Sequence, residues 1–464
     1  MATELDWLFN LQSRSIVAPA GYGKTELLAK AAAYYPSSLI LTHTHAGVHA
    51  ITARIKRLGI PKERVTVDTI ASWAGRYAHA FPKLANHPPQ NPRTGAEWNQ
   101  LYQGALNVLS NPVAQRIVQA SYDRIYIDEY QDCEGFQHAI ANTLACIVPT
   151  IIFGDPMQGI FEFVESRISL GGSVVQSFPV AYELDQPHRW NTCNPELGLW
   201  ISQVRHKLMT GEPIDLRQGP ISYRQAANAF DMSVFIEGND ERVGSTAAIH
   251  CRRGICDNLA KATKGFFQAI EEMAGARLIQ FGQHWDTAQN ASQRVGVLNA
   301  LLDDAMSRNV PRAQLPDNLH EFNARRQAAW NQFGITGSAE NAGEVLTLEK
   351  AHPFSRTHRG ELLNDARRAL VEVAFGRSES LTLACQQARR RLSHTGLSPV
   401  KRVISTPLLL KGLEFDHVII PDAGHFLNER YASAKLFYVA ISRARHALAI
   451  SSANPVLQFP RPTL

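Results

Sequence analysis

The segment that most constrains the fold is APAGYGKT at residues 18–25, a glycine-containing loop between an apolar run and a helical stretch. The composition of residues 15–18 favours a strand, and that of residues 26–35 favours a helix. Between these elements, glycines let backbone N–H groups face phosphate oxygens, and the helix N-terminus adds its positive dipole. Taken alone, the loop also fits a tight turn at a helix N-terminus, because Ala18 stands where the strict phosphate-loop pattern has glycine.

The side chains at the end of this loop suit a nucleoside triphosphate bound together with Mg²⁺. Lys24 would neutralise the β- and γ-phosphates, and the Thr25 hydroxyl would hold the metal ion. The expected nucleotide-contacting segment comprises Ala20, Gly21, Tyr22, Gly23, Lys24, Thr25 and Glu26.

A second segment, IYIDEYQD at residues 125–132, is an apolar strand that ends in paired carboxylates. Two adjacent acids at the end of a buried strand are costly without a cation. Asp128 is therefore the expected second support for Mg²⁺, and Glu129 can accept a proton from an attacking water molecule. With the loop at 18–25, this segment predicts a centre that hydrolyses a nucleotide.

Short apolar runs alternate with helical stretches at both ends of the chain. Strand-like runs are expected at 15–18, 39–42, 65–67, 124–128, 150–153, 402–405, 417–420 and 447–450, and helices at 26–35, 46–58 and 434–444. Such alternation predicts parallel sheets with helices on both faces, an α/β fold.

The composition changes between residues 265 and 397, where strands become scarce and helical periodicity dominates. This stretch predicts an inserted, mostly helical domain, with loops at 311–316 and 334–343. The expected domains are an N-terminal lobe (1–182, with a small insertion at about 77–120), a second lobe in two parts (183–264 and 398–464) and the helical insertion (265–397).

Charge and cysteine content narrow the class of protein. Residues 350–402 hold 11 Lys/Arg against 4 Asp/Glu, a local excess that fits either phosphate binding or a solvated helical face. Within it, we interpret His352, Arg356, His358 and Arg359 as a basic face rather than a catalytic site. The 6 cysteines are scattered, which favours reduced thiols over a zinc site. No apolar stretch could span a bilayer, so a cytoplasmic protein is expected.

With these residues in place, the chain resembles the superfamily 1A helicases, the UvrD/Rep/PcrA group. Segments similar to the family's motifs occur in the family's order at both ends of the chain. Besides the phosphate loop (Walker A), they are LTHTHA (41–46), TVDTIAS (66–72), DEYQD (128–132), GDPMQGIF (154–161), LDQPHR (184–189), KGLEFD (411–416) and YVAISRA (438–444).

The resemblance implies two RecA-like lobes with a nucleotide cleft between them. Gln158 would sense the γ-phosphate, and Arg189 and Arg443 would act as arginine fingers from the second lobe. Glu414 would hydrogen-bond the ribose, next to Gly412. Charge that spreads over the γ-phosphoryl oxygens in the transition state is what such cationic side chains stabilise.

The resemblance also implies a path for a single DNA strand. Phe161 and Phe163 lie where the family has aromatic side chains that stack on bases, a contact that tolerates any sequence. The alternative is that one or both are core residues. His43 and Thr69 are weaker candidates for contacts with the strand.

The chain departs from the family's pattern on the base-reading side and in size. Gln12 is the only glutamine before the loop and lies unusually close to it, and His188 stands where the family has tyrosine. Both accessory insertions are short, which argues against processive unwinding by this chain alone.

We therefore expect an ATP- and Mg²⁺-dependent DNA helicase or translocase. It would move 3′ to 5′ on single-stranded or partly duplex DNA, and it would serve as the motor subunit of a DNA repair or anti-phage defence complex with a nuclease or another protein partner. The alternative is a nucleotide-gated regulatory subunit of a nuclease complex with little unwinding activity. An RNA motor also stays open, because stacking and backbone contacts do not separate RNA from DNA.

Overall fold

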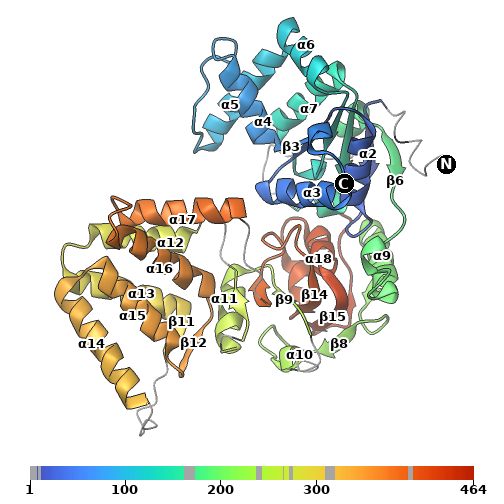
Figure 1. Ribbon diagram of the computed structural model, residues 1–464. Helices are drawn as coiled ribbons and strands as arrows, with labels where there is room; N and C mark the ends of the chain where they lie inside the picture. The colour runs from blue at the N-terminus through green and yellow to red at the C-terminus, as the bar shows by residue number, and fades with distance from the viewer. Residues whose placement is uncertain are drawn as a thin grey trace.

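A computed structural model describes residues 8, 12–160, 173–236, 243–264, 266–270, 275–308, 319–395 and 401–463. They form two α/β lobes and a helical domain beside the second lobe (Figure 1). Among these residues, no helix combines the length and apolar character needed to cross a membrane.

The first lobe is built on a six-stranded sheet in the order β3-β2-β4-β5-β1-β6, with every pair of neighbours parallel. Its strands are β1 (Arg14–Val17), β2 (Ser38–Thr42), β3 (Val65–Thr69), β4 (Arg124–Ile127), β5 (Thr150–Gly154) and β6 (Val180–Glu183). Its helices are α2 (Lys24–Tyr34), α3 (His45–Arg57), α4 (Ile70–Ala80), α5 (Gly95–Leu109), α6 (Pro112–Ser121), α7 (Gly135–Ile147) and α8 (Ser173–Ser177).

Helices cover both faces of the first sheet, and successive side chains of β4 point to opposite faces. Ile125 and Ile127 pack into a core with α4, α5 and α7, whereas Tyr126 points to the opposite core with α2 and α3. A strand buried on both faces loses the polar alternation of a half-exposed strand, which is why these runs are apolar throughout.

The second lobe repeats this plan with the strand order β10-β13-β9-β14-β15-β8, again with every pair parallel. Its strands are β8 (Ser222–Gln225), β9 (Thr246–Ile249), β10 (Gln268–Ala269), β13 (Arg402–Ser405), β14 (Phe415–Ile420) and β15 (Ala444–Ser452). Its helices are α9 (Pro195–Thr210), α10 (Ser233–Ile236), α11 (Arg253–Ala262) and α18 (Ser433–Ile441), and β7 (Ile214–Asp215) pairs with β16 (Val456–Leu457). The expected α/β class and its two parallel sheets are confirmed, with element ends that differ by up to three residues.

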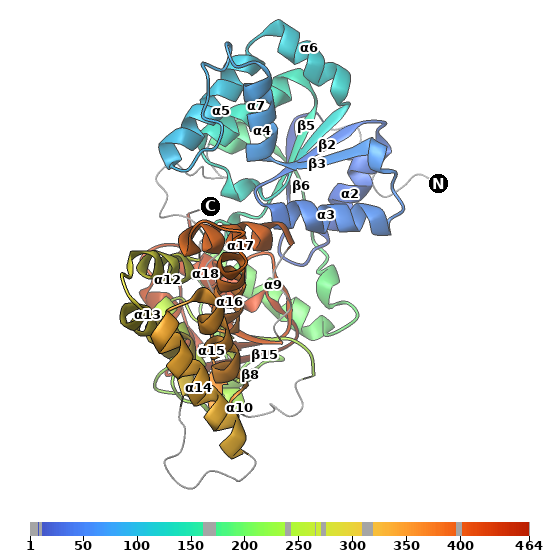
Figure 2. The ribbon, with the colours of Figure 1, turned by 60° about the vertical axis from the view of Figure 1, so that its left-hand side comes forward.

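The chain between β10 and β13 forms the helical domain, which has a core of its own. It comprises α12 (Ala276–Thr287), α13 (Ala291–Ala305), α14 (His320–Thr336), α15 (Ala339–Ala351), α16 (Gly360–Ala374), α17 (Leu381–Thr395) and the hairpin β11 (Met306–Arg308)–β12 (Ser355–Thr357). Its helix α17 reaches the first lobe and contacts α3, which lies above and to the right of it in Figure 2.

Two expectations for this domain need comment. The loop expected at 334–343 is wrong, because α14 continues to Thr336 and α15 begins at Ala339. Only Gly337, with φ +61°, and the N-cap Ser338 form the turn. The loop expected at 311–316 lies outside the described residues.

The expected basic face is also wrong for three of its four residues. His352, His358 and Arg359 are buried, and only Arg356 is exposed. Arg359 lies 2.8 Å from Asp257 of α11, so it joins the helical domain to the second lobe. Arg359 thus forms an internal ion pair and is not part of a basic surface. Composition alone does not distinguish these two cases.

Two glycines give a matched test of the helical packing. A Cβ on Gly282 of α12 would lie 2.8 Å from the Thr382 Cα atom, whereas a Cβ on Gly296 of α13 would meet no atom within 4 Å. We expect Gly282→Ala to destabilise the protein by about 2 kcal/mol through overpacking. Gly296→Ala should stabilise it by about 0.5–1 kcal/mol, because alanine is the better helix former. Thermal unfolding of both variants tests this, and equal effects would contradict the packing.

Candidate active site between the two lobes

The phosphate loop connects β1 to α2 and bends through two left-handed glycines. Gly21 has φ +82° and Gly23 has φ +84°, a region that side chains with a Cβ rarely adopt. A Cβ on Gly21 would also lie 2.7 Å from the Trp190 ring. Glycine is therefore required at this position both by conformation and by close packing, whereas Ala18 is simply buried at the end of β1.

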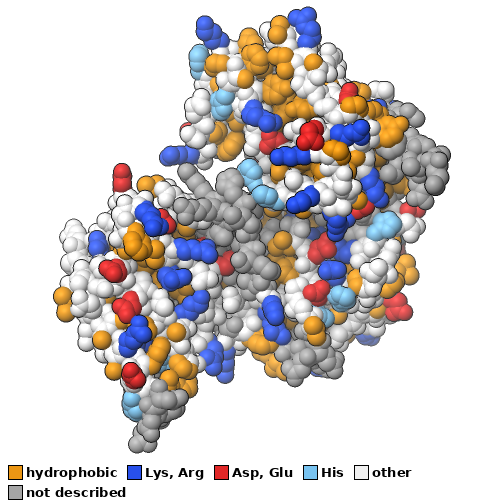
Figure 3. Space-filling model, in the orientation of Figure 1, with side chains coloured by type: hydrophobic (Ala, Val, Ile, Leu, Met, Phe, Trp, Pro, Cys, Tyr) orange, Lys and Arg blue, Asp and Glu red, His pale blue; other side chains and the backbone are white. Residues whose placement is uncertain are grey.

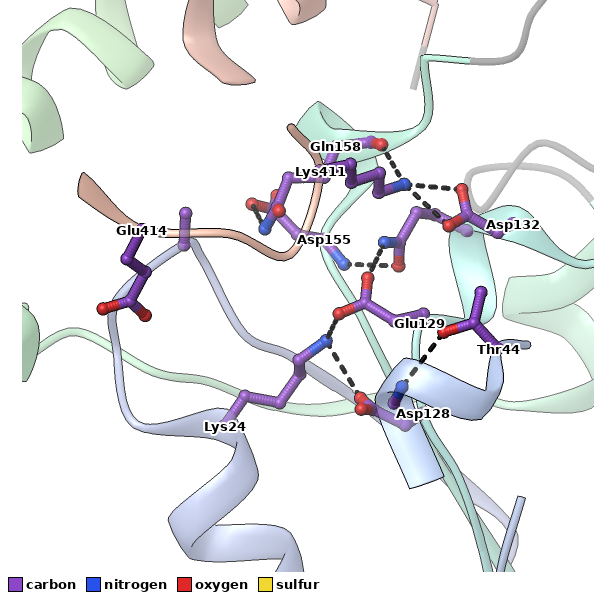
Figure 4. Close-up of polar contacts among 12 residues, drawn as sticks. Lys24, Thr44, Asp128, Glu129, Asp132, Asp155, Gln158, Lys411 and Glu414 are labelled. Carbon is purple, nitrogen blue, oxygen red and sulfur yellow. Dashed lines mark hydrogen bonds and ion pairs between the residues drawn. The ribbon is translucent and has the colours of Figure 1, made fainter. Parts of the chain in front are cut away.

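Three charged side chains meet directly beneath the loop (Figure 4). The Lys24 ammonium group lies 2.9 Å from Asp128 Oδ1 and contacts Glu129 Oε1. Glu129 follows β4 with φ +55°, a left-handed conformation that costs a residue with a Cβ roughly 1–3 kcal/mol. This strained turn directs the Glu129 carboxylate towards Lys24, so the residues expected from separate segments do converge.

The pKa values of the two neighbouring carboxyl groups, Asp128 and Glu129, shift in opposite directions from their usual values. Burial raises the pKa of Asp128, although Lys24 counteracts it. Burial would also raise the pKa of Glu129, but Lys24 and Lys411 together hold that pKa below its usual range. Burial lowers the pKa of Lys24, yet both carboxylates outweigh this and raise it. The site therefore holds an ionised Glu129 and a protonated Lys24 at neutral pH.

A chain of hydrogen bonds runs from Glu129 to the second lobe. Gln131 donates to Glu129 and accepts from the backbone N–H of Asp155 at 3.0 Å. Gln158 donates to the Asp155 carboxylate at 2.9 Å and accepts from Arg443 at 3.4 Å. Groups under the phosphate loop are thus connected to an arginine of the opposite lobe through buried partners.

The expected arginine fingers occupy different environments. Arg443 is 2% exposed and donates to the backbone carbonyls of Val439 and Leu413. Its burial, together with Arg189, lowers its pKa to about 10. Arg189 is more accessible, and it donates to Glu414 at 2.8 Å and to the Ser442 carbonyl.

The ribose and base side of the expected site is open. Glu414, expected at the ribose, is 45% exposed and pairs with Arg189, while Gly412 has φ +83° in the preceding turn. The exposed His188 ring covers Gly23, where a Cβ would approach it to 3.1 Å. Gln12 is exposed.

Other expected residues have structural partners. Glu26 pairs with Lys30 and Arg54, rather than facing the loop alone. Thr69 is 3% exposed and caps α4 by accepting from the Ser72 N–H. Its contact with a strand stays a prediction.

The remaining strand contacts are also untested. His43 lies after β2 with its Nε2 atom 3.5 Å from the Cys133 sulfur. Phe161 and Phe163 lie outside the described residues.

Several residues that connect the lobes were missed by sequence reasoning. The Ala20 N–H donates to the buried Tyr438 hydroxyl at 3.0 Å, and Tyr22 donates to Ser202 at 2.8 Å. Arg205 of α9 lies 3.3 Å from Asp155 and 2.9 Å from Glu183. Tyr438 begins a recognised motif and could have been found, whereas Arg205 belongs to none of the motif segments.

The donor set under the loop suits Mg²⁺, which prefers hard oxygen ligands. Thr25 follows Lys24 in the first turn of α2, and Asp128 supplies a buried carboxylate, the pKa of which burial raises. In the described part of the chain, no group of three or more His, Cys, Asp or Glu residues could hold a metal ion. A Mg²⁺ ion held by two protein ligands with phosphates and water needs no such group.

Comparisons with known proteins give two family matches. The model of the UvrD/REP helicase N-terminal domain matches residues 77–179, which include DEYQD and GDPMQ. The model of the UvrD-like helicase C-terminal domain matches residues 404–451, which include KGLEFD and YVAISRA. The resemblance noted from the motifs is therefore confirmed, with one helicase-domain match in each lobe. No curated protein matches the chain.

Solved helicase structures are also similar at low identity. The Pif1 helicase from Candida albicans has 13% identity and a TM-score of 0.42, over 97% of this chain and 93% of that one. The arterivirus nonstructural protein 10 helicase, solved with DNA, has 11% identity and a TM-score of 0.34, over 95% of this chain. This chain covers 60% of the length of the arterivirus protein.

Replacing the Tyr438 hydroxyl tests the contact between the phosphate loop and the second lobe. Tyr438→Phe leaves the buried Ala20 N–H without its acceptor, which should cost about 1–3 kcal/mol of stability. Tyr431→Phe, at a residue 45% exposed, should change stability by less than about 0.5 kcal/mol. Denaturant unfolding measures both, and similar values for the two variants would refute the role given to this hydroxyl.

Proposed function

We propose that this chain is an ATP-dependent DNA helicase or translocase of the UvrD type that uses Mg²⁺. The observation that carries the proposal is the meeting of the two lobes around the phosphate loop. Lys24 lies against Asp128 and Glu129 in the first lobe, and Arg443 of the second lobe donates to Gln158. The Arg189 backbone N–H donates to the Gly21 carbonyl at 2.8 Å. A nucleotide bound between these groups would contact both lobes, so its hydrolysis would change the orientation of one lobe relative to the other.

In this proposal, ATP competes with Glu129 for Lys24. The nucleotide phosphates would take the Lys24 ammonium group, and Glu129 would then be free to accept a proton from the attacking water. Asp128 and Thr25 would hold Mg²⁺, which neutralises charge on the β- and γ-phosphates. Gln158 would lie at the γ-phosphate, connected through the hydrogen-bond chain to Arg443.

The second lobe would complete the transition-state environment. Arg189 pairs with the exposed Glu414, and exchange of that partner for phosphate oxygens would bring a cation to the nucleotide. Glu414 would then be released to hydrogen-bond the ribose beside Gly412. His188 would stack on the base, and Gln12 would read its edge.

A single DNA strand would cross the two lobes, in contact with His43, Thr69, Phe161 and Phe163. Positive side chains in this region support the proposal. On the face in Figure 3, Lys and Arg side chains are numerous where the helical domain faces the lobes, and Lys261, Arg356 and Arg367 are among the exposed cations of that domain and α11. Backbone phosphates supply most of the affinity in such interfaces.

We further propose 3′ to 5′ movement, as in the family that the motifs resemble, and action as the motor of a repair or anti-phage complex with a nuclease. The alternative is a nucleotide-gated regulatory subunit. The contact of α17 with α3 favours that alternative, because it couples the helical domain to both lobes. Strand-displacement assays with and without co-purified partners separate the two functions.

Two substitutions test the catalytic assignment. Glu129→Gln removes the base without changing its shape, so we expect DNA-stimulated ATP turnover to fall by about 10²–10⁴-fold while binding of a non-hydrolysable ATP analogue persists. Lys24→Ala should abolish both turnover and analogue binding. Glu63→Gln, at an exposed carboxylate, is the matched control and should leave both unchanged. Wild-type turnover that is indifferent to any nucleic acid would count against the proposed function.

A further inference from the structure

Lys411, a cation of the second lobe, forms hydrogen bonds with residues of the first lobe. Lys411 lies between β13 and β14, and its Nζ atom is 2.6 and 2.7 Å from the two Asp132 carboxylate oxygens. The same Nζ atom donates to the Gln158 backbone carbonyl at 2.6 Å. Figure 4 shows all three residues above the Lys24 cluster.

The geometry suits the lysine. An ammonium group has three donors, and three oxygen acceptors lie within 2.7 Å of this one. The side chains of Lys411 and Asp132 are each 11% exposed, so the pair is largely shielded from water. Shielded opposite charges interact more strongly than an exposed surface pair.

The two acceptors belong to the two turns that carry the chemistry. Asp132 ends the 3-10 turn η2 (Tyr130–Asp132), which directly follows Glu129. The Gln158 carbonyl ends the turn η3 (Pro156–Gln158), whose glutamine side chain accepts from Arg443. One lysine of the second lobe therefore fixes the positions of both turns relative to its own lobe.

We propose that Lys411 is a positioning residue that bridges the lobes in the closed cleft, holding the turns of Glu129 and Gln158 in place through Asp132 and the Gln158 carbonyl. This inference rests on the proposed ATPase function. In the proposed cycle, separation of the lobes would move Lys411 away from both acceptors, so the contact would be specific to the arrangement in this structure. A contact made in one state shifts the equilibrium towards that state by its free energy.

The proposal predicts a coupled pair whose loss weakens closure. Lys411→Met keeps an unbranched apolar side chain but removes the ammonium group, and Asp132→Asn keeps the shape of the carboxylate without its charge. Each should raise the KM for ATP and the Kd of a non-hydrolysable analogue about tenfold, and lower DNA-stimulated kcat. The double variant should be no weaker than Lys411→Met alone, because Lys411→Met already removes the ion pair that Asp132→Asn removes.

Lys62→Met is the matched control, because Lys62 is an exposed lysine on the first lobe. It should leave KM, kcat and analogue binding unchanged. A merely structural role for Lys411 would instead lower the active fraction, and kcat with it, at an unchanged KM. Thermal unfolding of each variant reports the folded fraction, and Asp132→Asn alone still tests the proposal if Lys411→Met fails to fold.

Two results would overturn the inference. One is an analogue Kd within about twofold of wild type in folded Lys411→Met or Asp132→Asn. The other is a double variant in which the two effects multiply, which is the result for independent residues. Failure of the proposed function would give a different result, because ATP turnover of the wild-type protein would then not rise with DNA. The analogue Kd values of the single and double variants would still test the contact of Lys411 with Asp132.

Discussion

The arrangement of the site between the lobes depends on the compensation of buried charge at the end of β4. Asp128 and Glu129 are adjacent carboxylates beneath the phosphate loop, and Lys24 lies against both. A buried charge without a partner is costly, so the strained turn at Glu129 persists because it completes this ion-pair cluster. In the proposed function, the anionic phosphates of a nucleotide and Mg²⁺ would replace these partners.

The second lobe is joined to that cluster through several independent contacts. The hydrogen-bond chain ends at Arg443, Lys411 reaches Asp132, and the Tyr438 hydroxyl accepts from the phosphate loop itself. A small displacement of one lobe would leave some of these buried polar groups without partners, which is costly. The two lobes are therefore expected to adopt distinct relative positions rather than a continuous range. Binding at the phosphates is therefore expected to act on the angle between the lobes, which is what movement along a strand requires.

The two parallel sheets and the residues beneath the phosphate loop could be predicted from the sequence, because local patterns and the ends of strands determine them. Lys24, Asp128 and Glu129 each follow a recognisable strand, and parallel strands bring their carboxyl ends to one edge of a sheet. Contacts across the lobes could not be predicted in this way: Arg205 lies on an ordinary helix, and its partner Asp155 is distant in sequence. The surface position expected for Arg359 was wrong for the same reason, because its partner Asp257 belongs to another domain.

The central claim is that hydrolysis in this cleft moves the chain along a single strand. The most direct measurement is ATP-driven displacement of streptavidin from oligonucleotides biotinylated at either the 3′ or the 5′ end. The account predicts rapid, ATP-dependent displacement from the 5′ end and little from the 3′ end. ATP hydrolysis with no displacement from either end would contradict it.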